Sequence, residues 1–166
     1  MDIHCSMTPR IEKLNEKKLI GMRLRMSLSK NRTGELWKSF IPRKRELLNN
    51  LTSDLISLQV YSPTHFANFD PASEFEKWAT VEVSDFETVP KEMETFTLTG
   101  GMYAVFDYTG LSGDSGIFRH IFETWLPSSD YELDDRPHFE ILGAKYKNND
   151  PLSEEEIWIP IRPKSE

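Results

Sequence analysis

Two carboxylates inside apolar strands are the side chains of this sequence best suited to binding a charged ligand. Glu140 lies between two hydrophobic residues, so strand alternation turns it to the face opposite them. Glu156 shares a face with Trp158, because both alternate with the isoleucines of residues 157–161. A carboxylate on a partly buried surface attracts cations, since burial destabilises its ionised form until a cation arrives. The residues alone leave a second interpretation open, in which both carboxylates lie on a solvated sheet face.

Aromatic side chains could supply the walls of such a site. The faces of aromatic rings favour planar or cationic guests. Five aromatic residues in or beside the predicted strands are the candidate wall residues, namely Trp78, Tyr103, Tyr108, Tyr131 and Trp158. Together with the two carboxylates they form the predicted ligand-binding set.

Other common chemistries find no support in the residues. Metal-ligand spacing is absent among the four histidines, His4, His65, His120 and His138. The single cysteine, Cys5, lies in a polar N-terminal segment, which is a poor place for a positioned thiolate. The sequence has neither a Gly-x-Ser-x-Gly turn nor a phosphate-binding glycine loop. We therefore expect no metal and no cofactor.

The composition favours one globular domain in the cytoplasm. The chain has 166 residues, of which 38% are hydrophobic, and this length is enough for a single core. Its net charge of −7 repels phosphate backbones, so we expect no direct contact with nucleic acid. The first residues lack the apolar stretch of a signal peptide, and no apolar run reaches membrane-spanning length. We therefore expect a cytoplasmic protein with no membrane contact.

Hydrophobic periodicity predicts an α+β fold. Alternation predicts six strands, over Ile20–Ser29, Leu55–Tyr61, Glu74–Val83, Met102–Thr109, His138–Leu142 and Glu156–Ile161. Helical spacing predicts one helix capped by Thr33, with a kink or break at Pro42. A second helix is predicted to begin at Ser115 and to end at Pro127. Residues 1–17 are expected to be a loose lead-in.

The two predicted helices carry an internal repeat. The run Leu36-Trp37-x-x-Phe40-Ile41-Pro42 matches Ile121-Phe122-x-x-Trp125-Leu126-Pro127, 85 positions later. The order strand, helix, strand, strand also occurs twice. These features predict duplicated βαββ units with pseudo-two-fold symmetry, in one domain over residues 18–163 with halves at about 18–84 and 95–163. We expect an antiparallel sheet with helices on one face, and a ligand cleft on the other face or at the seam between the halves.

The C-terminal half resembles a known family. The stretch Trp125-Leu126-Pro127, Tyr131-Glu132-Leu133 and Arg136-Pro137-x-Phe139-Glu140, followed by Glu156-Ile157-x-Ile159-Pro160-Ile161, is similar to the GyrI-like small-molecule-binding family. This domain is the effector-binding module of AraC-type and other multidrug-responsive transcription regulators. The resemblance covers about residues 18–163 and implies the duplicated βαββ fold. It also implies a central cleft for hydrophobic or cationic molecules, with the family's acidic residue at Glu140 and with Leu142 where relatives often have tyrosine.

The resemblance implies a preferred function and two alternatives. We expect a stand-alone effector-binding protein, linked to transcription regulation or to resistance against drugs or toxins. The first alternative is a hydrolase of cyclopropane-bearing toxins, with Glu140 and either Glu156 or another acid of the cleft as general acid and base. The second is a protein-interaction role, such as binding a regulator or inhibiting a topoisomerase (gyrase) through the acidic residues 150–156. The sequence leaves a homodimer open.

Overall fold

Nine strands of the computed structural model form an antiparallel sheet, and the structure describes residues 8–67, 70–111, 116–147 and 150–165. Along the sheet the strands follow the order β1-β6-β9-β8-β3-β4-β2-β5, and β7 pairs with β9. The strands are β1 (Arg10–Leu14), β2 (Lys17–Met26), β3 (Leu55–Val60), β4 (Phe75–Val83), β5 (Glu94–Leu98), β6 (Gly101–Thr109), β7 (Tyr131–Leu133), β8 (His138–Leu142) and β9 (Glu154–Pro163). The sheet and its helices confirm the predicted α+β class.

Two helical segments accompany the sheet. The first is α1 (Thr33–Phe40), which tightens into the 3-10 helix η1 (Ile41–Glu46) next to Pro42. The second consists of α2 (Gly116–Arg119), the π-helix η2 (His120–Trp125) and α3 (Leu126–Ser128). Pro42 therefore breaks the first helix as predicted, whereas the predicted cap Ser115 lies outside the described residues. No helix in the described ranges is long and apolar enough to cross a membrane.

The strand order contains the predicted repeat. Strands β3 and β8 meet in the middle of the sheet, and Ile56 pairs there with Ile141. These two residues are 85 positions apart, which is the offset between the two helix motifs. The first half (β2-α1-β3-β4) and the second half (β6, the second helical segment, β8 and β9) are thus related by a pseudo-two-fold axis near this pair.

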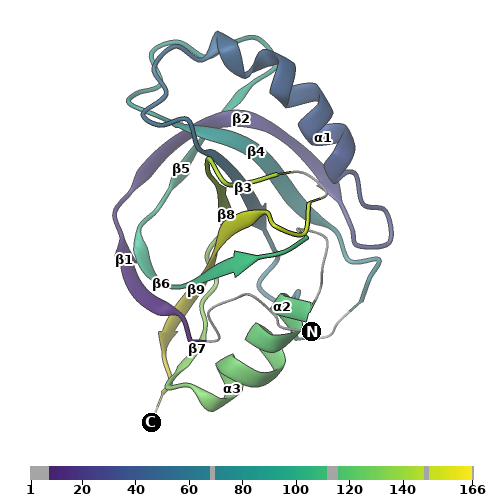
Figure 1. Ribbon diagram of the computed structural model, residues 1–166, viewed down its shortest axis with the longest axis vertical. Helices are drawn as coiled ribbons and strands as arrows, with labels where there is room; N and C mark the ends of the chain where they lie inside the picture. The colour runs from purple at the N-terminus through teal and green to yellow at the C-terminus, as the bar shows by residue number, and fades with distance from the viewer. Residues whose placement is uncertain (1–7, 68–69, 112–115, 148–149, 166) are drawn as a thin grey trace.

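The strand that precedes each half in the sequence pairs with the other half. Strand β1 pairs with β6, and β5 pairs with β2, so residues 10–21 lie against residues 94–105 in one continuous register. Figure 1 shows the sheet curling round on itself through these strands. Gly100 permits the close crossing, because a Cβ at this position would lie 2.1 Å from the carbonyl oxygen of Leu14. The segment expected to be a loose lead-in therefore contains a strand.

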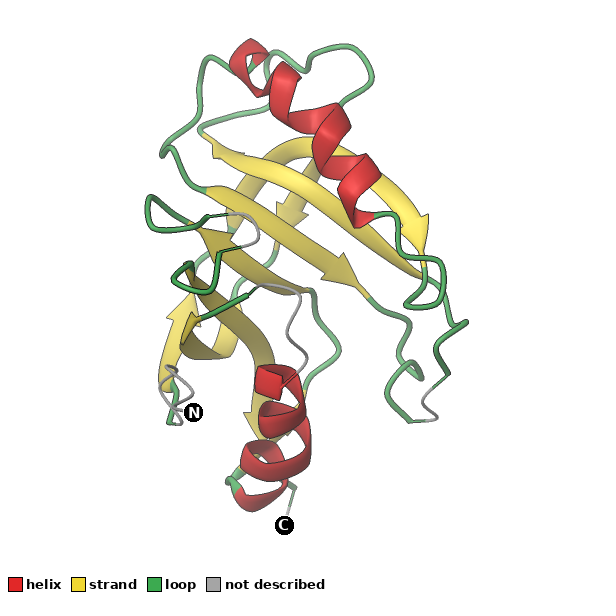
Figure 2. Ribbon diagram, turned by 45° about the vertical axis from the view of Figure 1, so that its right-hand side comes forward, coloured by secondary structure: helices red, strands yellow, loops and turns green. Residues whose placement is uncertain are grey.

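Side chains fill the face of the sheet that turns away from the helices. A cluster that includes Trp78, Tyr103, Phe139 and Trp158 packs inside the curled sheet. The opposite face carries two further clusters, one beneath α1 and one beneath the second helical segment (Figure 2). Of the two places expected for a cleft, the sheet face that turns away from the helices is therefore filled. Polar side chains gather at the other place, the seam between the two halves.

Candidate functional site

A polar strip runs along the seam, where the central strands β3 and β8 face the gap between the two helix-covered clusters. The register pairs Ser57 with Glu140 and Gln59 with His138. Side chains paired in this way point to the same face. Glu140 also pairs with Ile157 of β9, which packs in the cluster beneath the second helical segment. The strip therefore lies on the helix-bearing face of the sheet.

Glu140 is a recessed carboxylate without an ion pair to any residue that the structure describes. Gln59 Nε2 donates a hydrogen bond to its Oε1 at 3.5 Å. Burial raises the pKa of Glu140, while the positive charge of Lys77 and the hydrogen bond from Gln59 oppose this effect. The side chain keeps some contact with solvent, since its residue is half-buried.

Aromatic rings from four elements stand beside the strip. Phe66, in the loop after β3, stacks on Phe122 of η2 and on His138 of β8, with 5.3 Å between ring centroids in each pair. The ring centroid of Tyr61 lies 4.9 Å from that of His138 and 5.1 Å from that of Phe75 of β4. We call these five residues the aromatic wall.

His65 adds an unpaired polar atom to the aromatic wall. It contacts Tyr61 and Phe66 with ring centroids 4.6 and 5.0 Å apart. The residue is 8% exposed, and its buried Nδ1 has no hydrogen-bond partner among the described residues. A ligand could supply that partner.

The aromatic wall is uncharged at neutral pH. Burial lowers the pKa of His138 to about 3, and the neighbouring His65 adds to this effect. Burial also lowers the pKa of His65. The pKa of Tyr61 is raised by burial and by the charge of Glu140. Both imidazoles are therefore neutral near pH 7, and the phenol keeps its proton.

The structure places three predicted wall residues inside the curled sheet. Trp78, Tyr103 and Trp158 are at most 9% exposed. Trp158 stacks on Phe139 at 5.1 Å, and the Tyr103 hydroxyl donates a hydrogen bond of 2.8 Å to the carbonyl oxygen of Pro137. These three residues belong to the core on the other face and do not reach the seam.

Glu140 and Glu156 lie on opposite faces of the sheet. Glu140 pairs with Ile157, and Glu156 pairs with Ile141, so alternation separates the two carboxylates. Glu156 instead accepts hydrogen bonds from Arg10 Nη2 at 2.8 Å and from Trp158 Nε1 at 3.0 Å. Glu140 and Glu156 therefore do not form the acid–base pair that the hydrolase alternative named for them.

The two remaining predicted wall residues pack within the second half. The Tyr108 hydroxyl donates a hydrogen bond of 2.9 Å to the carbonyl oxygen of Leu111. Tyr131 stacks on Trp125 with 6.4 Å between ring centroids. Both tyrosines belong to the cluster beneath the second helical segment or pack against it. Of the seven predicted site residues, only Glu140 joins the polar strip.

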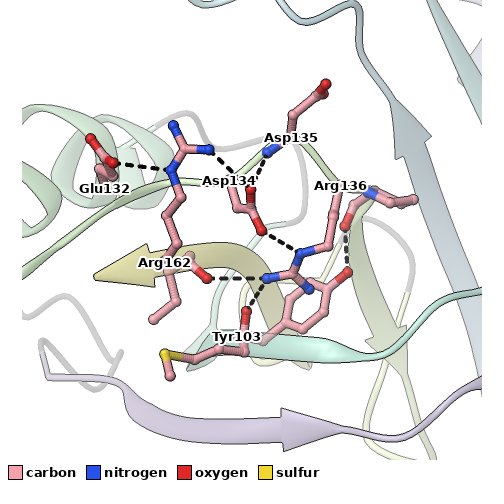
Figure 3. A network of polar contacts seen from close by, with 9 residues as sticks. Tyr103, Glu132, Asp134, Asp135, Arg136 and Arg162 are labelled. Atoms are coloured by element: carbon pink, nitrogen blue, oxygen red, sulfur yellow. Dashed lines mark hydrogen bonds and ion pairs between the residues drawn. The ribbon is translucent and has the colours of Figure 1, made fainter. Parts of the chain in front are cut away.

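Arg136, which precedes Glu140 in the family-like motif, holds the beginning of β8 in place (Figure 3). Its guanidinium lies 4.7 Å from the centroid of the Tyr103 ring, and its Nε donates to Asp134 at 2.7 Å. Its Nη2 also donates to the carbonyl oxygen of Met102 at 2.6 Å. Gly101, with φ of +148°, leaves room for this group, since a Cβ there would lie 2.3 Å from Nη1. The motif thus fixes β8, and with it the position of Glu140.

Most residues of the polar strip and of the aromatic wall were not predicted from the sequence. A signal was present in β3, where Ser57 and Gln59 occupy alternate positions on the face that should be apolar beneath helices. Both are about 5% exposed. The contribution of Phe66 and Phe122 depends on contacts between distant segments, and the local sequence carries no signal of it.

The antiparallel α+β fold with its internal repeat is that of a GyrI-like effector-binding domain. The chain belongs to the Cass2 family, described as integron-associated effector binding protein, whose profile matches residues 10–161. This assignment confirms the resemblance noted in the sequence.

Similar proteins include a regulator and two solved structures. The transcriptional regulator BrlR of Pseudomonas aeruginosa is 27% identical over 145 residues, which are 86% of this chain and 51% of the regulator. The chain thus spans about half the length of this curated relative. The structure of SAV2435 bound to tetraphenylphosphonium has a TM-score of 0.68 at 16% identity, with 93% of each chain covered. An integron cassette protein of Vibrio cholerae has a TM-score of 0.60 at 17% identity, covering 93% of this chain and 96% of its own.

Proposed function

We propose that the seam binds a bulky aromatic cation, with Glu140 as its counter-charge and the aromatic wall as its apolar contact. The observation that carries this proposal is a recessed Glu140 with no described ion pair, on the same strand as the wall residue His138. A cation at this point would stabilise the ionised carboxylate that burial destabilises. Ring faces add further attraction to a cation. The cation bound in the similar structure of SAV2435 belongs to the same chemical class.

We infer that the ligand acts as an effector and leaves the protein unchanged. The family is one of effector-binding proteins, and the relative BrlR is a transcriptional regulator. Glu140 and Glu156, the acid–base pair that the sequence suggested for a hydrolase, lie on opposite sheet faces. Mass spectrometry of tetraphenylphosphonium and of cyclopropane-bearing electrophiles after incubation tests this inference. Recovery of an electrophile with added water would contradict it.

Titration calorimetry of tetraphenylphosphonium into the protein at pH 7.5 tests the role of Glu140. We expect Glu140→Gln to weaken the binding of this cation by about ten-fold or more, because a charge-assisted contact is lost. Binding of the uncharged triphenylphosphine oxide should change little. The matched control is Glu156→Gln, on the opposite face, which should leave both affinities unchanged. An equal loss for the cation and the neutral compound in Glu140→Gln would argue against the counter-charge role.

A further inference from the structure

An acidic groove opens at the ends of the strands, beside the proposed cation site. Its volume is about 480 Å³, and it lies where β3 and β9 begin and β8 ends. Its lining includes Asp54, Tyr108, Gly143, Lys145, Glu154 and Glu155. An acidic lining alone does not define a binding site, but the carboxylates of this groove differ in their partners.

Glu155 is the carboxylate of this groove that burial leaves without a partner. It is 9% exposed and lines the groove, and no hydrogen bond or ion pair joins its side chain to another residue in the described ranges. Its carboxylate oxygens keep some contact with solvent. The two carboxylates next to it in the sequence, in contrast, have ion-pair partners. Glu156 is held by Arg10 at 2.8 Å, and Glu154 lies 3.8 Å from Lys145. A buried carboxylate in this state is incomplete until a donor or a cation reaches it.

Glu155 and Glu140 lie on the same face of the sheet, close enough for one ligand to reach both. Glu140 pairs with Ile157, and Glu155 is two residues before Ile157 on β9. Such diagonal neighbours have Cα atoms about 7–8 Å apart. The charge of Glu140, added to burial, helps to raise the pKa of Glu155 to about 8. The two carboxylates therefore repel each other when both are ionised.

We propose that the ligand of this protein carries two cationic centres, an aromatic cation in the seam at Glu140 and an ammonium group in the groove at Glu155. This inference rests on the proposed function and adds the chemical class of the ligand. An ammonium supplies donors to Glu155, and the second positive charge removes the repulsion between the two carboxylates. The part of the ligand beyond the ammonium group can extend through the groove into solvent.

Two probes with the same head group test the proposal. Aminobutyl-triphenylphosphonium carries a terminal ammonium, and pentyl-triphenylphosphonium carries a methyl group in its place. We expect the amino compound to bind about ten-fold more tightly to the wild-type protein, because it gains a charge-assisted hydrogen bond. Glu155→Gln should abolish this difference and leave the affinity for the pentyl compound nearly unchanged. Glu92→Gln, a matched exposed carboxylate outside the groove with a long ion pair of 3.7 Å to Arg43, should retain the difference.

Proton release gives an independent readout in the wild-type protein. At pH 7 Glu155 holds its proton, and an ammonium beside it would expel that proton. Calorimetry in buffers with different ionisation enthalpies should therefore show more proton release for the amino compound than for the pentyl compound. This measurement needs no variant, so it still tests the proposal if Glu155→Gln fails to fold.

The outcomes separate this inference from the proposed function. Equal affinities for the two probes would overturn the second cationic centre and leave the first intact. A difference that persists in Glu155→Gln, or disappears equally in Glu92→Gln, would also overturn it, since general acidity would then be the cause. If neither probe binds, both the proposed function and this inference fail.

Discussion

At the scale of single residues, the seam combines recessed carboxylates with neutral rings. Glu140 and Glu155 both have a raised pKa, with burial as the largest cause. Lys77 acts in the opposite direction on both, and His138 remains neutral. A protein that lacks its ligand must therefore tolerate carboxylates that prefer to be protonated. This preference links both stability and ligand affinity to pH.

The stability of the unliganded protein should report the burial of Glu155. Its pKa in the folded state, about 8, lies above the ordinary value of 4.5. The folded state thus holds the proton more tightly, and this group's contribution to stability falls as the pH rises from about 4.5 through 8. We expect Glu155→Gln to raise the melting temperature by about 5 °C at pH 8.5 and hardly at all at pH 4.5. Calorimetric scans at both values check this, and parallel pH profiles of variant and wild type would disprove it.

Ligand affinity should depend on pH in the opposite direction. Because burial raises the pKa of Glu140, protons compete with a cation for this carboxyl more strongly as the pH falls. Tetraphenylphosphonium, whose own charge is independent of pH, should therefore bind more weakly at pH 5 than at pH 8. Calorimetry across this range checks the trend, and Glu140→Gln should flatten it. A decrease of the same size in that variant would assign the effect to another group.

At the scale of elements, the loop after β3 is the part of the seam best placed to contact a ligand. It carries Phe66, which is 43% exposed although it stacks on Phe122 and His138. An exposed aromatic residue contributes little to the core, while its free surface can cover a guest. Binding and folding should therefore depend on different aromatic residues.

Phe66→Ala should separate the two roles. We expect the affinity for tetraphenylphosphonium to fall by about ten-fold, because the apolar contact is lost, while the melting temperature changes by less than about 3 °C. The matched control is Phe118→Ala, on the second helical segment, where the ring packs against the cluster beneath it. That variant should lower stability and leave affinity nearly unchanged. Unaltered affinity in Phe66→Ala would remove the loop from the proposed site.

At the scale of the whole molecule, exchanged strands join the two halves. Strand β1 completes the second half, and β5 completes the first. Leu14 of β1 is 7% exposed and belongs to the cluster inside the curled sheet, whereas Ile11 on the same strand is 41% exposed. Residues near the N-terminus therefore contribute directly to the core that supports the seam.

Leu14→Ala should destabilise the protein far more than Ile11→Ala. Removing a buried leucine side chain costs about 2–5 kcal/mol of unfolding free energy, and truncating an exposed residue costs about 0.5 kcal/mol or less. Urea unfolding of both variants measures the difference. Equal, small effects would mean that residues 10–14 are the loose segment that the sequence suggested.

The sequence by itself determined the α+β class, the repeat with its offset of 85 residues, and the side of its strand on which each carboxylate lies. These features are local, because alternation and helical spacing act within one element. Only the tertiary structure decided which faces come together. Alternation cannot say whether Glu140 on β8 and Glu156 on β9 share a face, since this depends on the register between the two strands. The strands β1 and β5 and the stacking of Phe66 on Phe122 are stabilised by partners far away in the chain, so their own short patterns were too weak to reveal them.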